Sequence, residues 1–142
     1  MTFTLFGRWQ IRIGLLLSIG VILSTAIMLK SGQVIGLQTF LTLIYLGVFG
    51  LIWDCSYHQL QRFRWDGDWN GLLQLISAVW EGLFMLILIK YVGLPGIDRA
   101  NFNIPGFIGF YTLLSSIGFI VSHSVFRILA PYSRFNGGRL FY

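Results

Sequence analysis

Charged residues are scarce in this chain. They make up 11% of its 142 residues, whereas charge reaches about 25% in an average soluble domain. Hydrophobic residues account for 56%, and the mean hydropathy is +0.75. This composition excludes an ordinary water-soluble domain, so we expect the chain to fold in a membrane. Its net charge of +5 then orients it in the bilayer, and no nucleic-acid partner is expected.

Cysteine and histidine are also rare, with one cysteine and two histidines. A lone cysteine excludes an intramolecular disulfide and a Cys-x-x-Cys motif, so Cys55 is interpreted as a packing residue. His58 is expected at the membrane interface and His123 inside it, which argues against a haem held between them. No nucleophile and base stand at a recognisable catalytic spacing. We therefore expect no enzyme activity, no metal and no cofactor.

Long apolar runs, by contrast, are abundant. Crossing a hydrocarbon core of about 30 Å takes roughly 17–25 apolar residues in a helix. Four runs reach that length, at residues 13–29, 36–54, 71–91 and 107–130. Pro95 and Gly96 stop the third run, and Pro131 stops the fourth. The sequence predicts an all-α integral membrane bundle of four transmembrane helices, forming a single domain over residues 1–142.

Small residues recur at helical spacing in the first run. One set is Gly14, Ser18 and Thr25, and another is Gly20 and Ser24. Small side chains let helix backbones approach closely in lipid, so both sets are interpreted as packing faces.

Basic residues are distributed unevenly around the four runs. An even number of spans places both termini and the middle loop on one side of the membrane. That side holds seven arginines and the other side three basic residues, which predicts cytoplasmic termini. The seven are Arg8, Arg12, Arg62, Arg64, Arg127, Arg134 and Arg139, and the three are Lys30, Lys90 and Arg99.

The segment between the second and third runs combines aromatic, basic and acidic residues. Its two tryptophans favour the lipid headgroups, and its two arginines would face anionic lipid. Either of its aspartates could cap the third helix and meet the positive end of the helix dipole. We expect a membrane-surface loop made of Arg62, Arg64, Trp65, Asp66, Asp68 and Trp69.

The same loop matches the first half of a calcium-binding loop of EF-hand type. Alternate oxygen ligands, Asp66, Asp68 and Asn70, are followed by Gly71. The twelfth position, which requires a bidentate acid, is Ser77. Without that carboxylate we expect no calcium site.

Glu81 is the one acid in the interior of an apolar run. A carboxylate near the bilayer centre costs roughly 2.5–3.5 kcal/mol on insertion scales, so it should face the bundle and find a partner. His123 is the expected partner. We predict an intramembrane polar pocket that opens to the cytoplasm and binds a proton, a cation or a headgroup; the alternative is that Glu81 only fixes helix packing. The pocket would comprise Glu81, His123, Asp54, His58, Gln74 and Ser77.

Three short motifs carry a resemblance. They are Trp65-Asp-Gly-Asp-Trp69, then Trp80-Glu-Gly82, and an Arg-x-x-Gly-Gly-Arg segment ending at Arg139. In these the chain resembles small uncharacterised multi-pass membrane proteins of cyanobacteria. The resemblance implies a plasma or photosynthetic membrane, and it implies no activity and no ligand.

Small size, small-residue helix faces and the lack of a catalytic constellation favour an accessory or scaffold subunit of a larger membrane assembly. Its partners would be the lipid bilayer and other integral membrane proteins. The alternative is a small homo-oligomeric transporter or channel, linked to protons or ions, that uses Glu81. A third class, binding of anionic lipid through the loop, would rest on Arg62 and Arg64.

Overall fold

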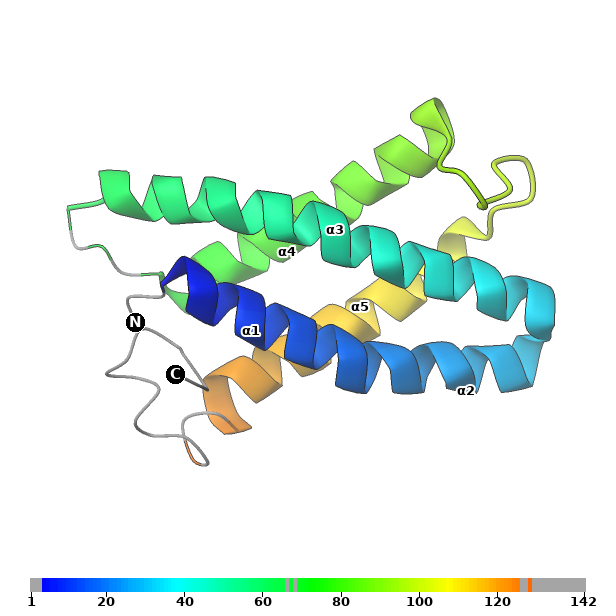
Figure 1. Ribbon diagram of the computed structural model, residues 1–142, viewed down its shortest axis with the longest axis horizontal. Coiled ribbons are helices and arrows are strands. Elements are labelled where there is room, and N and C mark those ends of the chain that lie inside the picture. The colour runs from blue at the N-terminus through cyan, green and yellow to red at the C-terminus, as the bar shows by residue number, and fades with distance from the viewer. Residues whose placement is uncertain (1–3, 66, 68, 126–127, 129–142) are drawn as a thin grey trace.

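The computed structural model describes residues 4–65, 67, 69–125 and 128. These residues form an all-helical bundle with four helices that are long and apolar enough to cross a membrane (Figure 1). The first consists of α1 (Leu5–Leu15), a π-helical turn (Leu16–Gly20) and α2 (Val21–Ser31). The second is α3 (Gln33–Phe63), the third is α4 (Gly71–Ile87) with a π-helical turn (Leu88–Val92), and the fourth is α5 (Ile104–Ile120) with a π-helical turn (Val121–Val125).

The predicted all-α class and the four apolar helices are confirmed. The first two helices are longer than the apolar runs at 13–29 and 36–54 indicated, because they extend to Leu5–Ser31 and Gln33–Phe63. The added turns include Arg8, Arg12 and Gln61, whose side chains form hydrogen bonds inside the bundle. The third and fourth helices span Gly71–Val92 and Ile104–Ser124; the end expected at residue 130 lies outside the described residues.

Side-chain caps mark where three of the helices begin. Thr4 Oγ1 accepts a hydrogen bond from the amide of Gly7, and Asn103 Oδ1 accepts one from Gly106. At the start of α4, Asn70 Oδ1 accepts from the amide of Leu73 at 3.0 Å. The prediction that an aspartate caps this helix is therefore wrong, since Asn70 lies directly before the first turn. Asp66 and Asp68 lie outside the described residues.

The bundle consists of two helical hairpins. The first (residues 5–63) folds back at Gly32, whose φ of 92° suits glycine. Within it, the first transmembrane-length helix and α3 pack closely at two glycines: a Cβ on Gly20 would meet Leu43, and one on Gly36 would meet Met28. The second hairpin (residues 71–125) joins α4 and α5, where a Cβ on Gly82 would meet the ring of Tyr111.

The apolar core occupies one half of the bundle. Along α3 its residues precede Gly50, and along the antiparallel α4 they follow Glu81. The core side chains are Leu43, Leu46, Met85, Ile89, Ile97, Phe107, Phe110 and Leu114. The other half, toward the 64–70 loop, holds the buried charged residues Arg8, Asp54 and Glu81, whereas the buried hydroxyls of Ser24 and Thr42 lie in the apolar half.

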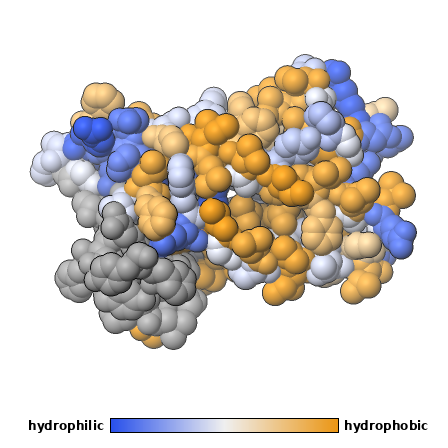
Figure 2. Space-filling view, in the orientation of Figure 1, coloured by the Kyte–Doolittle hydropathy of each residue, from blue (hydrophilic) through white to orange (hydrophobic). Residues whose placement is uncertain are grey.

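The face seen in Figure 2 is mostly apolar along its length, with hydrophilic residues gathered toward both ends. Cys55 is exposed, so its interpretation as a packing residue is wrong. Of the two small-residue sets in the first helix, Gly20 and Ser24 are buried, whereas Gly14, Ser18 and Thr25 are exposed. Only Gly20 and Ser24 therefore pack within this chain.

Candidate functional site

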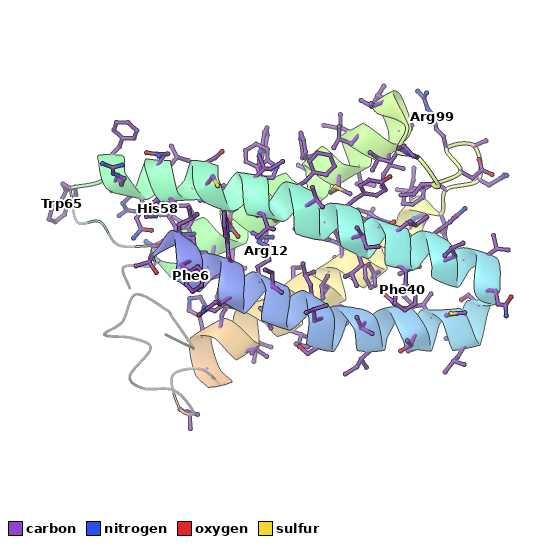
Figure 3. All side chains as sticks on the ribbon, viewed as in Figure 1. Phe6, Arg12, Phe40, His58, Trp65 and Arg99 are labelled. Atoms are coloured by element: carbon purple, nitrogen blue, oxygen red, sulfur yellow. The ribbon has the colours of Figure 1, made fainter. Side chains whose placement is uncertain are left out.

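The centre of the polar half is Arg12 of α1, which joins two acids from other helices. Its Nε and Nη2 donate to the carboxylate of Asp54 on α3, at 2.7 and 2.9 Å. Its Nη1 and Nη2 donate to the carboxylate of Glu81 on α4, at 2.8 and 3.0 Å. We call these three residues the Arg12 cluster; Figure 3 shows Arg12 between the helices. Two bidentate contacts fix the guanidinium plane and hence the positions of three helices.

Both carboxylates of the Arg12 cluster are removed from the surface. Asp54 is 4% exposed and Glu81 6% exposed, while the Arg12 side chain is 23% exposed. Buried charges need close opposite partners because their loss of hydration costs several kcal/mol per ion. Here each carboxylate oxygen accepts a hydrogen bond from the guanidinium. The cluster thus satisfies its own acids without solvent.

Gly50 makes room for Arg12 to cross α3. A Cβ placed at Gly50 would lie 2.4 Å from Arg12 Nη1 and 2.9 Å from Cζ. Asp54 follows one turn later on the same face of α3, so the guanidinium passes over the glycine to reach the acid. This face of α3 therefore changes from close packing at Gly50 to charged chemistry at Asp54.

A second polar layer lies one turn beyond the cluster. Arg8, which precedes Arg12 by four residues on α1, donates from Nη2 to Gln61 Oε1 at 2.7 Å. Its guanidinium carbon also sits 4.4 Å from the ring centroid of Trp69, a cation–π contact. Gln61 in turn donates from Nε2 to the carbonyl of Gly67 at 2.7 Å. This layer ties α1 and the end of α3 to the following loop.

Polar side chains also connect α4 to its neighbours. Gln74 Nε2 donates to Ser122 Oγ on the α5 side at 3.1 Å. Tyr111 Oη donates to the carbonyl of Ala78 at 2.6 Å, and Tyr57 Oη from α3 donates to the carbonyl of Ser77 at 3.4 Å. Gln74, Ser77 and Glu81, which we predicted to line a pocket, therefore lie on the side of α4 that faces the bundle.

The predicted pairing of Glu81 with His123 is wrong. Both oxygens of Glu81 accept from Arg12, which is an obligate cation with a fork matched to a carboxylate. His123 instead stacks on Phe119, with ring centroids 4.4 Å apart, and its Nδ1 lies 3.3 Å from Ser122 Oγ. The imidazole therefore belongs to the edge of the polar half.

A cavity of about 520 Å³ lies beside the Arg12 cluster. The first hairpin contributes side chains from α1 and α3, and the second contributes side chains from α4 and α5. Of the six residues in the predicted pocket, four line it: Asp54, Gln74, Ser77 and Glu81. His58 and His123 do not line it, and the Nδ1 atom of His58 is buried with no hydrogen-bond partner among the described residues.

The predicted membrane-surface loop is only partly exposed. Arg62 is exposed and Trp65 is 97% exposed, extending away from the bundle (Figure 3). Trp69, by contrast, is 7% exposed, because the Arg8 guanidinium and the Tyr57 ring cover it. Its expected place at the headgroups is therefore wrong.

Arg12 is the functional residue that the sequence analysis missed. It was interpreted as an orientation charge at the end of a span, and the same holds for Arg8. Two features of the sequence indicate a buried role for these arginines. Their four-residue spacing puts both guanidiniums on one helix face, and the neighbouring apolar runs contain two acids that need a cation.

The described residues contain no candidate metal-binding group, and the comparisons with known proteins gave no match. Within the part of the chain that the structure describes, no group of three or more His, Cys, Asp or Glu side chains could hold a metal ion. No protein-family model, no curated protein and no solved structure matches the chain. The Arg12 cluster holds one cation and two acids, and Arg8 adds a second cation beside the same cavity.

Proposed function

We propose that this chain is an integral membrane protein that acts as an accessory or scaffold subunit of a larger membrane assembly. The observation that carries the proposal is the presence of small-residue faces on the outside of both hairpins. Gly14 and Gly109 are exposed, and a Cβ at either would have nothing within 4 Å. In lipid, such faces allow a neighbouring helix to pack closely.

Each glycine belongs to a longer face. Ser18, one turn after Gly14, is exposed and donates its hydroxyl to the Gly14 carbonyl at 2.6 Å. Thr112 and Ser116 follow Gly109 at helical spacing and are exposed. Because their hydroxyls can be satisfied within their own helices, these faces suit both lipid and a helix partner.

The Arg12 cluster supports the same proposal. Its guanidinium joins the two hairpins, with Asp54 in the first and Glu81 in the second. A bundle fixed in this way presents its outer faces in a constant arrangement, which an assembly subunit requires. This role matches the interpretation of Glu81 as a residue that fixes helix packing.

The orientation with cytoplasmic termini is part of the proposal. Arg8 and Arg12 lie inside the bundle, so they leave the count of surface charges. Seven minus these two gives five arginines against three basic residues, which still favours cytoplasmic termini. The resemblance to cyanobacterial proteins supports a plasma or photosynthetic membrane as the location.

Enlarging an open glycine should detach the partner and leave the chain folded. We expect Gly14→Leu and Gly109→Leu to keep the free energy of unfolding within about 0.5 kcal/mol of the wild type, since both positions are exposed and a Cβ at either meets no atom within 4 Å. Both should abolish co-purification with a larger protein in mild detergent, measured by mass spectrometry.

The control is Val48→Leu, which enlarges another exposed position, on α3. It should retain the partner. Co-purification that survives both glycine variants, or a wild-type chain that purifies without any larger partner, would contradict the scaffold proposal.

A homo-oligomeric transporter is the second candidate, favoured by the cavity next to Glu81. It requires ion- or proton-linked flux across liposomes that Glu81→Gln abolishes, because the amide keeps the side-chain shape and removes the charge. For a scaffold we expect no flux from either protein and unchanged partner binding. If a defined homo-oligomer shows flux that depends on Glu81, the scaffold proposal is contradicted and the transporter is supported.

A further inference from the structure

The cavity beside the Arg12 cluster has a polar end and an apolar end. On α3, Asp54 and Tyr57 line one end and Leu46 the other; on the antiparallel α4, Gln74 and Ser77 line the first end and Leu86 the second. α5 repeats the order, with Ser122 at the polar end and Phe107 and Ile108 at the apolar end. On each of the three helices the polar residues named lie toward one end of the cavity and the apolar residues named toward the other. Leu75 and Phe119 add apolar surface at the polar end. This arrangement fits a molecule with a head and a hydrocarbon chain.

The cavity also reaches the outer surface of the bundle. The lining residues that are exposed all belong to the second hairpin. They are Leu75, Val79 and Leu83 of α4, and Ile108, Thr112 and Ser116 of α5. Because both helices are long and apolar enough to cross a membrane, this access leads to the hydrocarbon region. A ligand dissolved in the membrane can enter here without crossing water.

The charged residues that line the cavity determine which charge the head of a ligand can carry. Two guanidiniums, Arg8 and Arg12, and two carboxylates, Asp54 and Glu81, give a formal sum of zero. Both carboxylates are held in bidentate contacts with Arg12. The Arg8 guanidinium is engaged by Gln61 and the Trp69 ring. Among the described residues, a charged head would therefore have to displace one of these contacts to gain a counter-ion, and it would lose its hydration at a cost of several kcal/mol. An uncharged head avoids this cost.

Uncharged hydrogen-bonding groups are available at the polar end. Gln74 uses one N–H for Ser122, and its amide retains an oxygen acceptor and a second N–H. A hydroxyl can both donate to and accept from such a group, and a carbonyl can accept from it. The volume of about 520 Å³ falls within the range of roughly 300–1,000 Å³ that small-molecule sites occupy.

We propose that this cavity binds an uncharged, membrane-dissolved amphiphile with a hydroxyl or carbonyl head. The head lies toward Gln74 and Ser122, and the hydrocarbon chain lies toward Leu86 and Phe107. The proposal does not require a partner at the outer glycine faces. Thr112 and Ser116 belong to both the cavity lining and the Gly109 face, so binding is measured on the chain alone.

A series of three probes tests the charge preference on the wild-type chain. Dodecan-1-ol, dodecanoate and dodecylamine share a hydrocarbon chain and differ in head charge at mildly alkaline pH. In phosphatidylcholine nanodiscs, with binding measured by equilibrium dialysis against empty discs, we expect the alcohol to bind at least about tenfold more tightly than either charged probe. Equal binding of the three, or tighter binding of a charged one, would overturn the proposal.

A matched pair of variants tests the location. Ser115→Trp places a large ring in the cavity lining, and it should weaken dodecan-1-ol binding by about tenfold or more. Leu113→Trp, two residues earlier on α5, adds the same ring at an exposed position that does not line the cavity. It should bind like the wild type. Unchanged binding by folded Ser115→Trp would overturn the site.

The same dialysis distinguishes two natural sources of the ligand. Farnesol carries the same hydroxyl head on a branched isoprenoid chain, whereas dodecan-1-ol carries a straight alkyl chain like that of a fatty alcohol. Saturable binding of either alcohol supports the proposal, and the tighter one identifies the chain type. Binding of neither above empty discs would overturn it.

Discussion

Replacing Arg12 with methionine is expected to lower the free energy of unfolding by about 3–5 kcal/mol, the usual cost of removing one partner from a buried ion pair. The substitution leaves the carboxylates of Asp54 and Glu81 facing each other without the cation that holds both. It also removes the ionic contact of Arg12 with Glu81, which joins the two hairpins. Reversible unfolding in mixed micelles, as a function of ionic detergent, measures the loss.

Removing the acids as well should restore most of the stability. A set of buried charges can often be replaced by apolar side chains of similar volume at little or no cost. The triple variant Arg12→Met, Asp54→Leu, Glu81→Met should therefore unfold within about 1 kcal/mol of the wild type. A triple variant as unstable as Arg12→Met alone would show that the loss comes from packing around residue 12 and not from unpaired charge.

The second large effect is expected at Gly50, where alanine should cost about 1–3 kcal/mol through overpacking. Its Cβ would come within 2.4 Å of Arg12 Nη1 and 3.0 Å of Cδ. The guanidinium cannot move freely to relieve this contact, because four hydrogen bonds hold it. The same unfolding experiment provides the measurement.

Gly47→Ala is the matched control, one turn earlier on α3. The nearest atom to its Cβ would be Leu16 Cδ1 at 3.4 Å, the end of a flexible side chain. This variant should remain within about 0.5 kcal/mol of the wild type. The cost of Gly50→Ala should also fall in an Arg12→Met background, since methionine has no guanidinium to displace. Equal costs in both backgrounds would contradict the role assigned to Gly50.

Several features of the fold could be predicted from local sequence. Apolar runs longer than a hydrocarbon core need helices, because no other open structure satisfies every backbone group in lipid. That argument predicted the limits of α4 closely, and it predicted the central parts of α2, α3 and α5. It failed at the ends of the first two helices, where Arg8 and Gln61 interrupt the apolar pattern yet lie buried in longer helices.

The candidate site was predicted in part. Glu81, Asp54, Gln74 and Ser77 do lie on the inner side of the bundle, next to the cavity. Helical spacing indicated this for α4, where polar side chains recur on one face. The prediction of His123 as the partner of Glu81 was wrong, because spacing within one helix carries no information on how far a second helix is rotated or shifted. Arg12 is 69 residues away from Glu81 in the chain.

Composition and periodicity alone determined that this protein is a set of four apolar helices, since hydrocarbon length and backbone hydrogen bonding leave few alternatives. They also determined that an acid inside such a helix must have a partner. Only the tertiary structure decided which partner, because the side-by-side packing of α1 and α3 at Gly50 brings the Arg12 guanidinium within reach of both carboxylates. The cavity is likewise a property of how the two hairpins meet, a relation between segments that no single stretch of sequence contains.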